Sequence, residues 1–539
     1  MLRSRRRSLQ IFFCFVALLC ALRVSRAEAS TPAPSARRTV CVVSFNSTDE
    51  VEVFRSLLPA DQFAFVDLSP RASTAPASDL ATPVDSSPSG QSWIFDGCRP
   101  DLQCDVVVYS AEFAGRFFGK QGFSLSLQEM EEAACQPRCA GLFHHPQEVF
   151  LLGCNTLATK DQDSRTPDEY LQVLLDHGFD RASAEEVVAL RYGPVGPSFR
   201  EALRRAFAGV PRIYGFASVA PKGDRIAPLL ATYLRSRGNY AQYLERTAGQ
   251  SGRNVGLLRA FRETDLTQAS GLGRDERGAA DRDAICSLYD ERRSVPDRLR
   301  IARGLMSRPD LLAFVPTLET VLARHPPDGF QGESRSLFAQ LQGLDAARER
   351  VLGLVRELDV SALKLELAHF ALEMRWITRA DLRRTAVDSA RQLLARPLTS
   401  ESVDILCTIA QREDLSDEFT SKDFSKTLLD LPEGLRLVDC LHPTDERINA
   451  RLTPALDSND SALRLWAAYV LSRRLPLDDH TLVRLAGYLN DPLPDLRERV
   501  RWSFRAQRPT SAEVATAVRV RDPGFAKELQ LDTVRLSGR

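Results

Sequence analysis

The stretch EVFLLG at residues 148–153 decides the fold class, because it is a short apolar run that stops at a glycine. A run of this length and composition is typical of a strand that is buried on both faces of a sheet. The pattern recurs in TVCVVSF at 39–45, QFAFVDL at 62–68, DVVVYS at 105–110 and RIYGF at 212–216. The first half of the chain is therefore predicted to contain these five strands.

Helical patterns lie between the predicted strands. Apolar residues repeat at helical spacing across 51–58, 125–134, 168–176, 184–190 and 198–207, and the last of these, SFREALRRAF, is clearly amphipathic. Strands that alternate with helices indicate a parallel sheet covered by helices on both faces. In such sheets the chemistry sits beyond the carboxyl ends of the strands, so the residues that follow each strand are the candidates for a site.

The second half of the chain loses its strand signals after the polar, glycine-rich stretch at 270–283, and helical periodicity takes over. Several helices combine a capping acid, a basic residue in the first turns and an apolar stripe. They resemble the second helices of HEAT repeats, a family of stacked helix pairs, most clearly over 458–506. An irregular helical bundle is the alternative. The clearest predicted helices are 297–307, 309–324, 344–357, 361–374, 378–395, 402–412, 461–474 and 494–506.

Residues 1–27 predict a secretory signal peptide. Four arginines near the start precede an apolar run of twelve residues at 11–22, and small residues at Ser25 and Ala27 stand where a signal peptidase reads the chain. Twelve residues are too few to span a bilayer, which takes about 20. The protein is therefore expected to be exported, either periplasmic or extracellular, with no membrane span in the mature chain. An uncleaved membrane anchor is the alternative.

These patterns divide the rest of the chain into regions. Residues 28–38 form a polar lead-in, 39–270 an α/β domain with a mainly parallel sheet, and 284–539 an all-α, HEAT-like domain. Within the α/β domain, residues 70–92 are rich in Ser, Pro, Ala and Thr and predict a disordered loop. The formal net charge is zero and no long basic run follows the signal, so nothing indicates a nucleic-acid partner. The GK[ST] signature of a phosphate-binding loop is missing, and no cofactor is predicted.

Nine cysteines remain after the predicted signal peptide. In an oxidising compartment the close pairs Cys98/Cys104 and Cys135/Cys139 are candidate disulfides. Either pair could instead bind a metal ion, although no histidine lies at the spacing of a zinc finger. An odd total leaves at least one thiol free, and Cys154 is the candidate for it.

The order of the strands and of the residues after them resembles one enzyme clan. YSAEFAG at 109–115 closes one predicted strand, FLLGCNTLA at 150–158 closes the next, and a helix and strand follow at 199–221. This order resembles the caspase-like cysteine peptidases, which include caspases, gingipains and CHAT domains, over about residues 39–235. In that clan a His-Gly closes one strand and the nucleophilic cysteine closes the next. The resemblance implies a caspase-like fold with Cys154 at the position of the nucleophile.

The chemistry of that clan depends on two neighbouring parallel strands that bring their terminal side chains to one edge of the sheet. A histidine there deprotonates the thiol and later protonates the leaving amine. In this chain Glu112 occupies the position of the histidine, and no histidine occurs from 39 to 143. A carboxylate beside Cys154 raises the pKa of the thiol and works against the thiolate. Glu112 could serve as a weak base; the alternative is a solvated or ion-paired carboxylate.

The remaining polar candidates have simpler roles. His144 and His145 come before the strand that leads to Cys154, so they are expected at the opposite edge of the sheet. They could be metal ligands, but adjacent residues of an extended segment point apart. His177 follows the strand beyond a helical segment. Arg116 could pair with Glu112 or bind an acidic ligand.

Two functions are consistent with these residues. The first is an exported interaction protein with an inactive caspase-like domain and a helical-repeat surface that docks a protein or peptide. It expects no active-site labelling of Cys154, and loss of partner binding when the helices are removed. The second is an active cysteine endopeptidase that uses Cys154 with a non-standard base. A hydrolase unrelated to this clan is a weaker third possibility, and the missing acid–base machinery favours the first function.

Overall fold

The first half of the chain folds into a six-stranded sheet in the order β2-β1-β3-β7-β8-β9. The first five strands are parallel, whereas β9 runs antiparallel to β8. The five predicted strands are confirmed, and β9 is an addition. The strands are β1 (Arg38–Ser44), β2 (Phe63–Asp67), β3 (Val106–Ser110), β7 (Glu148–Leu152), β8 (Arg212–Phe216) and β9 (Leu266–Ala269).

The computed structural model of the protein describes residues 37–45, 48–70, 93–119, 124–160, 165–176, 181–413, 415, 417–419, 430–441, 452–474, 476–507 and 509–531. The expected signal peptide lies outside the described residues. So do most of the polar lead-in at 28–38 and of the loop expected at 70–92.

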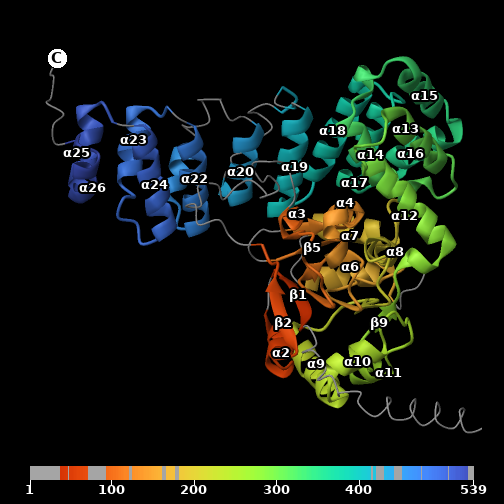
Figure 1. Ribbon diagram of the computed structural model, residues 1–539. Helices are drawn as coiled ribbons and strands as arrows, with labels where there is room; N and C mark the ends of the chain where they lie inside the picture. The colour runs from red at the N-terminus through yellow and green to blue at the C-terminus, as the bar shows by residue number, and fades with distance from the viewer. Residues whose placement is uncertain are drawn as a thin grey trace, which may run out of the picture.

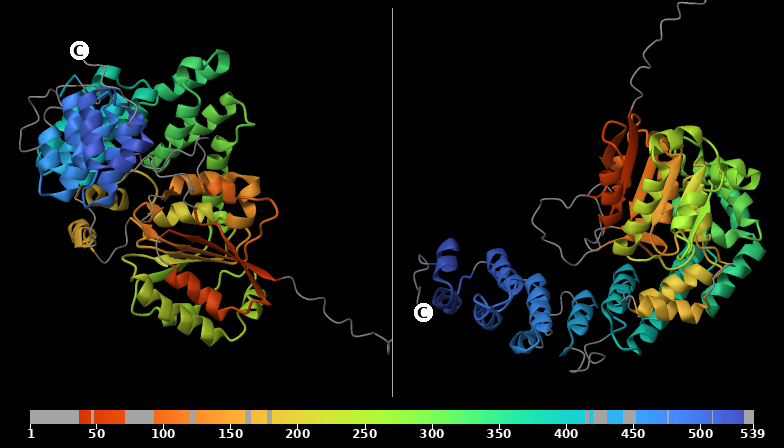
Figure 2. Two further views of the ribbon diagram at one scale, coloured as in Figure 1. Left: turned by 90° about the vertical axis from the view of Figure 1, so that its left-hand side faces the viewer. Right: turned by 90° about the horizontal axis from the view of Figure 1, so that it is seen from below.

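Helices cover both faces of this sheet, as the alternation of strands and helices predicts. Alternate side chains of each central strand enter opposite layers: Val106 and Val108 pack on one face, Val107 and Tyr109 on the other. Figure 2 shows the two layers with the sheet between them. The layers are α2 (Asp49–Leu57), α9 (Gly223–Arg237), α10 (Tyr240–Arg246) and α11 (Val255–Ala260) on one face, and α4 (Leu127–Cys135), α5 (Ala140–Phe143) and α8 (Phe199–Ala206) on the other.

A smaller antiparallel sheet follows β3 and was not predicted. Its strands are too short for a periodic signal. A turn at Gly115, with a φ of 79°, reverses the chain between the first two of them. The same region includes two helices predicted from the sequence, α6 and α7, and the short helix α3. The elements are β4 (Glu112–Phe113), β5 (Arg116–Phe118), β6 (Ser124–Ser126), α3 (Ile94–Gly97), α6 (Pro167–Asp176) and α7 (Arg181–Tyr192).

The second half is helical, and from α16 onward each helix packs mainly on its near neighbours in the chain. Figures 1 and 2 show these helices curving away from the sheet, with α25 and α26 at the far end. No described helix is both long and apolar enough to cross a membrane. The helices are α12 (Glu276–Tyr289), α13 (Val295–Met306), α14 (Val315–Arg324), α15 (Gly332–Gln342), α16 (Asp345–Glu357), α17 (Ser361–Glu373), α18 (Arg379–Leu394), α19 (Ser400–Glu413), α20 (Pro432–Leu441), α22 (Ser461–Arg473), α23 (Asp479–Ala486), α24 (Pro494–Ala506), α25 (Ala512–Arg521) and α26 (Pro523–Glu528).

The eight helices named from the sequence in this half are all present, seven of them with bounds that shift by at most two residues. The largest shift is at 309–324, because a turn of 3₁₀ helix (Leu311–Ala313) precedes α14. The stretch expected as a polar boundary at 270–283 already contains the first half of α12.

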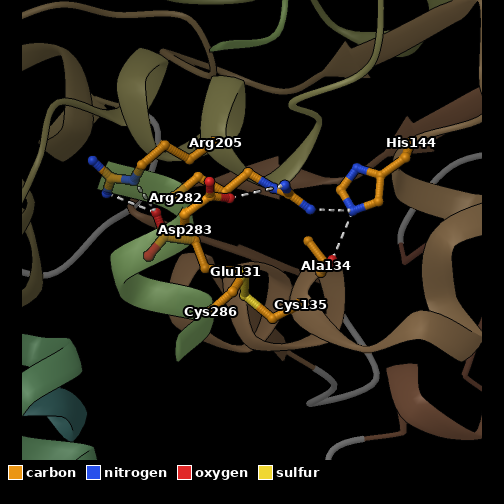
Figure 3. Close-up of a disulfide and its surroundings, with 8 residues drawn as sticks. All are labelled: Glu131, Ala134, Cys135, His144, Arg205, Arg282, Asp283 and Cys286. Carbon is orange, nitrogen blue, oxygen red and sulfur yellow. Dashed lines mark hydrogen bonds and ion pairs between the residues drawn. A yellow bond between two sulfur atoms is a disulfide. The ribbon is translucent and has the colours of Figure 1, made fainter. Parts of the chain in front are cut away.

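The helical array contacts the sheet domain at several places along the chain. Near its start, α12 packs on α4 and α8, and the disulfide Cys135–Cys286 joins α4 to α12. Figure 3 shows this bridge beside the buried pair of Arg205 and Glu131. Further along, α19 packs on α7.

Four disulfides cross-link the described residues, and the predicted pairs are wrong. Instead of Cys98/Cys104 and Cys135/Cys139, the bridges join residues from different elements. Each sequence-local pair is separated by a change of chain direction, so its members face different neighbours. Cys104, for example, lies two residues before β3, and its bridge reaches Cys41 on the adjacent strand β1. The bridges are Cys41–Cys104, Cys98–Cys139, Cys135–Cys286 and Cys407–Cys440, and Cys154 is free as expected.

Digestion of the unreduced protein should release four cross-linked peptide pairs that match these bridges. Mass spectrometry after alkylation should find the alkyl group on Cys154 alone among the nine cysteines expected in the mature chain. A peptide that links Cys98 to Cys104, or Cys135 to Cys139, would contradict the structure.

A buried ion pair lies at the opposite end of the sheet from the carboxyl ends of its strands. Glu148, the first residue of β7, accepts a hydrogen bond of 2.8 Å from Arg212 Nε, and both side chains are almost completely buried. The hydroxyl groups of Tyr214, at 2.6 Å, and Tyr240 also donate to Glu148. Burial, reinforced by the Glu148 carboxylate, raises the pKa of both tyrosines, so they stay protonated and can donate. This cluster ties β7 and β8 to the helices below them.

We expect Glu148→Ala to lower the free energy of unfolding by about 3–5 kcal/mol, because it leaves the Arg212 guanidinium buried without its carboxylate. Urea unfolding followed by circular dichroism measures the change. The control is Glu263→Ala, which removes an exposed partner of Arg262 and should leave the transition midpoint where it is. Equal midpoints for the two variants would show that the buried cluster does not hold the sheet together.

Candidate functional site

The structure brings Cys154 and Glu112 to the same edge of the sheet, as predicted. Cys154 is the second residue after β7, and Glu112 is the second residue after β3. These strands are parallel neighbours, and Ser110 pairs with Leu152 at their carboxyl ends. The two side chains are close enough for the Glu112 charge to act on the thiol.

The turn that carries Cys154 is held rigidly against β8. Asn155 adopts a left-handed conformation with a φ of 58°, which costs less for asparagine than for most residues. Its backbone N–H donates to the carbonyl of Ser218 at 2.7 Å, and its buried side chain donates to the hydroxyl of Tyr170. The Thr156 hydroxyl accepts a hydrogen bond of 3.1 Å from the backbone N–H of Phe216. The position of the thiol is therefore set by contacts of the two residues that follow it.

Gly153 is required for this close approach. A Cβ atom at this position would lie 2.8 Å from the carbonyl oxygen of Ala111 and 2.9 Å from the Cβ of Phe113. Because Ala111 and Phe113 flank Glu112, the glycine lets the Cys154 turn sit directly against the segment that carries the carboxylate. The sequence shows this glycine but not the contact that requires it.

The surroundings of the thiol oppose its ionisation. Burial raises the pKa of Cys154, and the Glu112 carboxylate raises it further. The backbone N–H of Ala220 donates to Sγ at 3.3 Å and favours the thiolate, but it offsets the other two effects only in part. At neutral pH the thiol is therefore protonated. A protonated thiol is a poor nucleophile, so the site as it stands does not favour covalent catalysis.

No histidine among the described residues stands beside Cys154. His144 and His145 precede β7 and lie at the opposite edge of the sheet, as predicted. The ring Nε2 of His144 is 2.7 Å from the carbonyl oxygen of Ala134, and burial, together with the nearby Arg282, lowers the pKa of the ring (Figure 3). The other described histidines belong to the helical array or the loops within it. His177 lies outside the described residues.

The four cysteines that could have formed a metal site cannot do so. Cys98, Cys104, Cys135 and Cys139 are all in disulfides, so none can act as a thiolate ligand. Within the described ranges, no group of three or more His, Cys, Asp or Glu side chains is arranged to hold a metal ion. Arg116, the proposed partner for an acidic group, is exposed on β5 and pairs with Ser126 across the small sheet.

We predict that Cys154 of the folded protein reacts slowly with a thiol-directed peptide electrophile at pH 7 and faster as the pH rises toward its raised pKa. Glu112→Gln removes the like charge and should increase the rate at pH 7 by about threefold to tenfold. Peptide mapping by mass spectrometry measures the label. Glu263→Gln, far from the thiol in the sequence and exposed, is the control and should not change the rate. Rapid and selective labelling of the unaltered protein at neutral pH would instead show an activated nucleophile.

Comparison with known proteins found no match, so the function is argued from the geometry of the site. No family model matches the chain, and no curated protein and no solved structure matches it either. The arguments that remain are the placement of Cys154 and Glu112, the buried state of the thiol, and the surfaces that the helices present.

Proposed function

We propose that the chain is an exported interaction protein, in which a caspase-like domain without peptidase activity carries a helical-repeat surface that docks a protein or peptide. The observation that carries the docking role is a surface on α20, α22 and α24. The argument against peptidase activity is the burial of Cys154 beside Glu112, which raises the pKa of the thiol, with no histidine near it in the described ranges.

The docking surface consists of Arg436, Trp466, Arg499 and Trp502, and we call it the aromatic–arginine surface. The buried ring of Tyr469 contacts Trp466 and Arg499 and supports it from within. The guanidinium of Arg436 lies 4.8 Å from the ring centre of Trp466, and that of Arg499 lies 4.5 Å from the ring centre of Tyr469. Trp502, one turn after Arg499 on α24, is 41% exposed. Trp, Tyr and Arg are the residues that most often dominate binding at protein interfaces. Their continuity across three helices supports a docking site.

Three features support the remaining parts of the proposal. Glu112 and Cys154 each follow the end of β3 or β7, two parallel neighbours, by two residues, which is the order of elements that the caspase-like resemblance requires. The sequential packing of the helices suits a HEAT-like repeat better than an irregular bundle. Disulfides such as Cys41–Cys104 form and persist in oxidising compartments, which supports export.

An active cysteine endopeptidase is the second candidate, and one observation favours it. Asn155, directly after Cys154, is held in a left-handed conformation, and strained residues of this kind often lie at active sites. The turn also directs the Ala220 N–H toward Sγ. This candidate needs an activated thiol, and the labelling rate of Cys154 at neutral pH separates it from the first.

Trp502→Ala in the full-length protein should weaken capture of its protein partner by about tenfold or more, as expected for an exposed aromatic anchor. Quantitative mass spectrometry of proteins bound to the tagged chain, in the exported fraction of the source cells, measures the loss. Val520→Ala is the matched control, because Val520 is an exposed apolar residue of the same array, 75% accessible on α25. If both variants captured the same proteins in equal amounts, the aromatic–arginine surface would not be the docking site.

A further inference from the structure

A cavity lies beside β9, and its lining is strongly basic. It has a volume of about 420 Å³ and is lined by Arg200 and Arg204 from α8 and by Arg253 from the loop before α11. Ser251, Thr267 and Ser270 also line it, whereas no acidic residue does. Three arginines and three residues with hydroxyl side chains therefore line one small cavity.

The arginines stand near one another without compensating acids in the cavity. Arg200 and Arg204 are one helical turn apart, on the same side of α8. Burial and the charge of Arg200 lower the pKa of Arg204, although Asp275 and Glu201 act in the opposite direction. Neither of these carboxylates lines the cavity, and Asp275 caps α12 by accepting a hydrogen bond from the backbone of Arg277. An anion bound between these side chains would reduce the electrostatic repulsion between their like charges.

The cavity is also partly preorganised. Arg204 donates from Nε to the carbonyl oxygen of Ser270 at 2.7 Å, which fixes the plane of its guanidinium. On the other side, Asn254 N donates at 2.8 Å to the side chain of Gln268, and Gln268 donates at 3.1 Å to the carbonyl oxygen of Gly252. These two bonds hold the loop of Arg253 against β9. The two basic walls of the cavity therefore keep a fixed separation.

We propose that this cavity binds a tetrahedral oxyanion, the phosphate or sulfate monoester of a larger ligand. Arginine binds such groups through paired N–H donors, and hydroxyl groups complete the coordination of a four-oxygen anion. A planar carboxylate has only two oxygens and would leave part of the basic lining without an acceptor. The site stands apart from Cys154 and does not depend on the docking function.

A neighbouring cleft could hold the part of the ligand beyond the oxyanion. A cleft of about 980 Å³ between the α/β domain and α16 shares Arg200 and Arg204 with the oxyanion cavity. Its other lining includes Ser198 at the start of α8, and Arg350 and Glu357 from α16. The mixed charge and polarity of this cleft suit the hydroxyl groups of a sugar.

Isothermal titration calorimetry of the full-length protein tests the site with inorganic phosphate and with sulfate, in sodium chloride at constant ionic strength. We expect saturable binding at one site, and acetate should bind more weakly than either ion. Arg200→Gln and Arg253→Gln should each weaken binding by about tenfold, the effect of losing a hydrogen bond to a charged group. Titration with glucose 6-phosphate and glucose 6-sulfate then distinguishes a phosphate ester from a sulfate ester.

Arg262→Gln is the matched control. Arg262 is an exposed arginine of the same domain that pairs with Glu263 and does not line the cavity, so its loss should leave the affinity unchanged. Arg253 is exposed, and its variant keeps the test valid if Arg200→Gln does not fold. Absence of saturable binding, or an equal loss of affinity in Arg262→Gln, would overturn the proposal.

Discussion

The buried pair of Glu148 and Arg212 is the interaction on which both candidate sites depend. It joins the first residues of β7 and β8, so it fixes the register of two strands whose opposite ends carry Cys154 and Ser218. Arg212 also donates to the carbonyl oxygens of Thr247 and Gln250, at the end of α10 and in the loop beyond it. That loop continues to Arg253. One buried ion pair therefore positions the turn of the thiol and one wall of the basic cavity.

The two sites illustrate opposite uses of charge. At Cys154, burial raises the pKa of the thiol, and a carboxylate placed where a reactive thiol would need a cation or a base raises it further. Beside β9, arginines are gathered without carboxylates among them, which leaves positive charge to be balanced by something from outside. The first arrangement suppresses chemistry, while the second favours recognition. Together they support our proposal of a protein that binds rather than one that cleaves.

Much of the fold could be predicted from the sequence, and the missing parts have physical reasons. The strands β1, β3, β7 and β8 are buried on both faces and therefore read as apolar runs. In contrast, β9 is a short, half-buried edge strand, and LTQA has no such pattern. The placement of Glu112 and Cys154 at one edge followed from the order of their strands. The disulfide partners did not, because they depend on which elements become neighbours. In the sequence, Arg200 and Arg204 belong to the polar face of an amphipathic helix. Arg253 is distant in the chain, so the sequence does not show that the three arginines line one cavity.

The bridge between Cys135 and Cys286 also sets an order of events in biosynthesis. Its two cysteines are 151 residues apart, and a chain that leaves a ribosome or crosses a membrane does so from its N-terminus. Cys135 therefore cannot form its native bridge until the first helix of the array has arrived, although Cys41, Cys98, Cys104 and Cys139 can already pair. During that interval its thiol can attack the other bridges and form non-native disulfides. A disulfide isomerase that acts late in folding would resolve such bonds in favour of the native set.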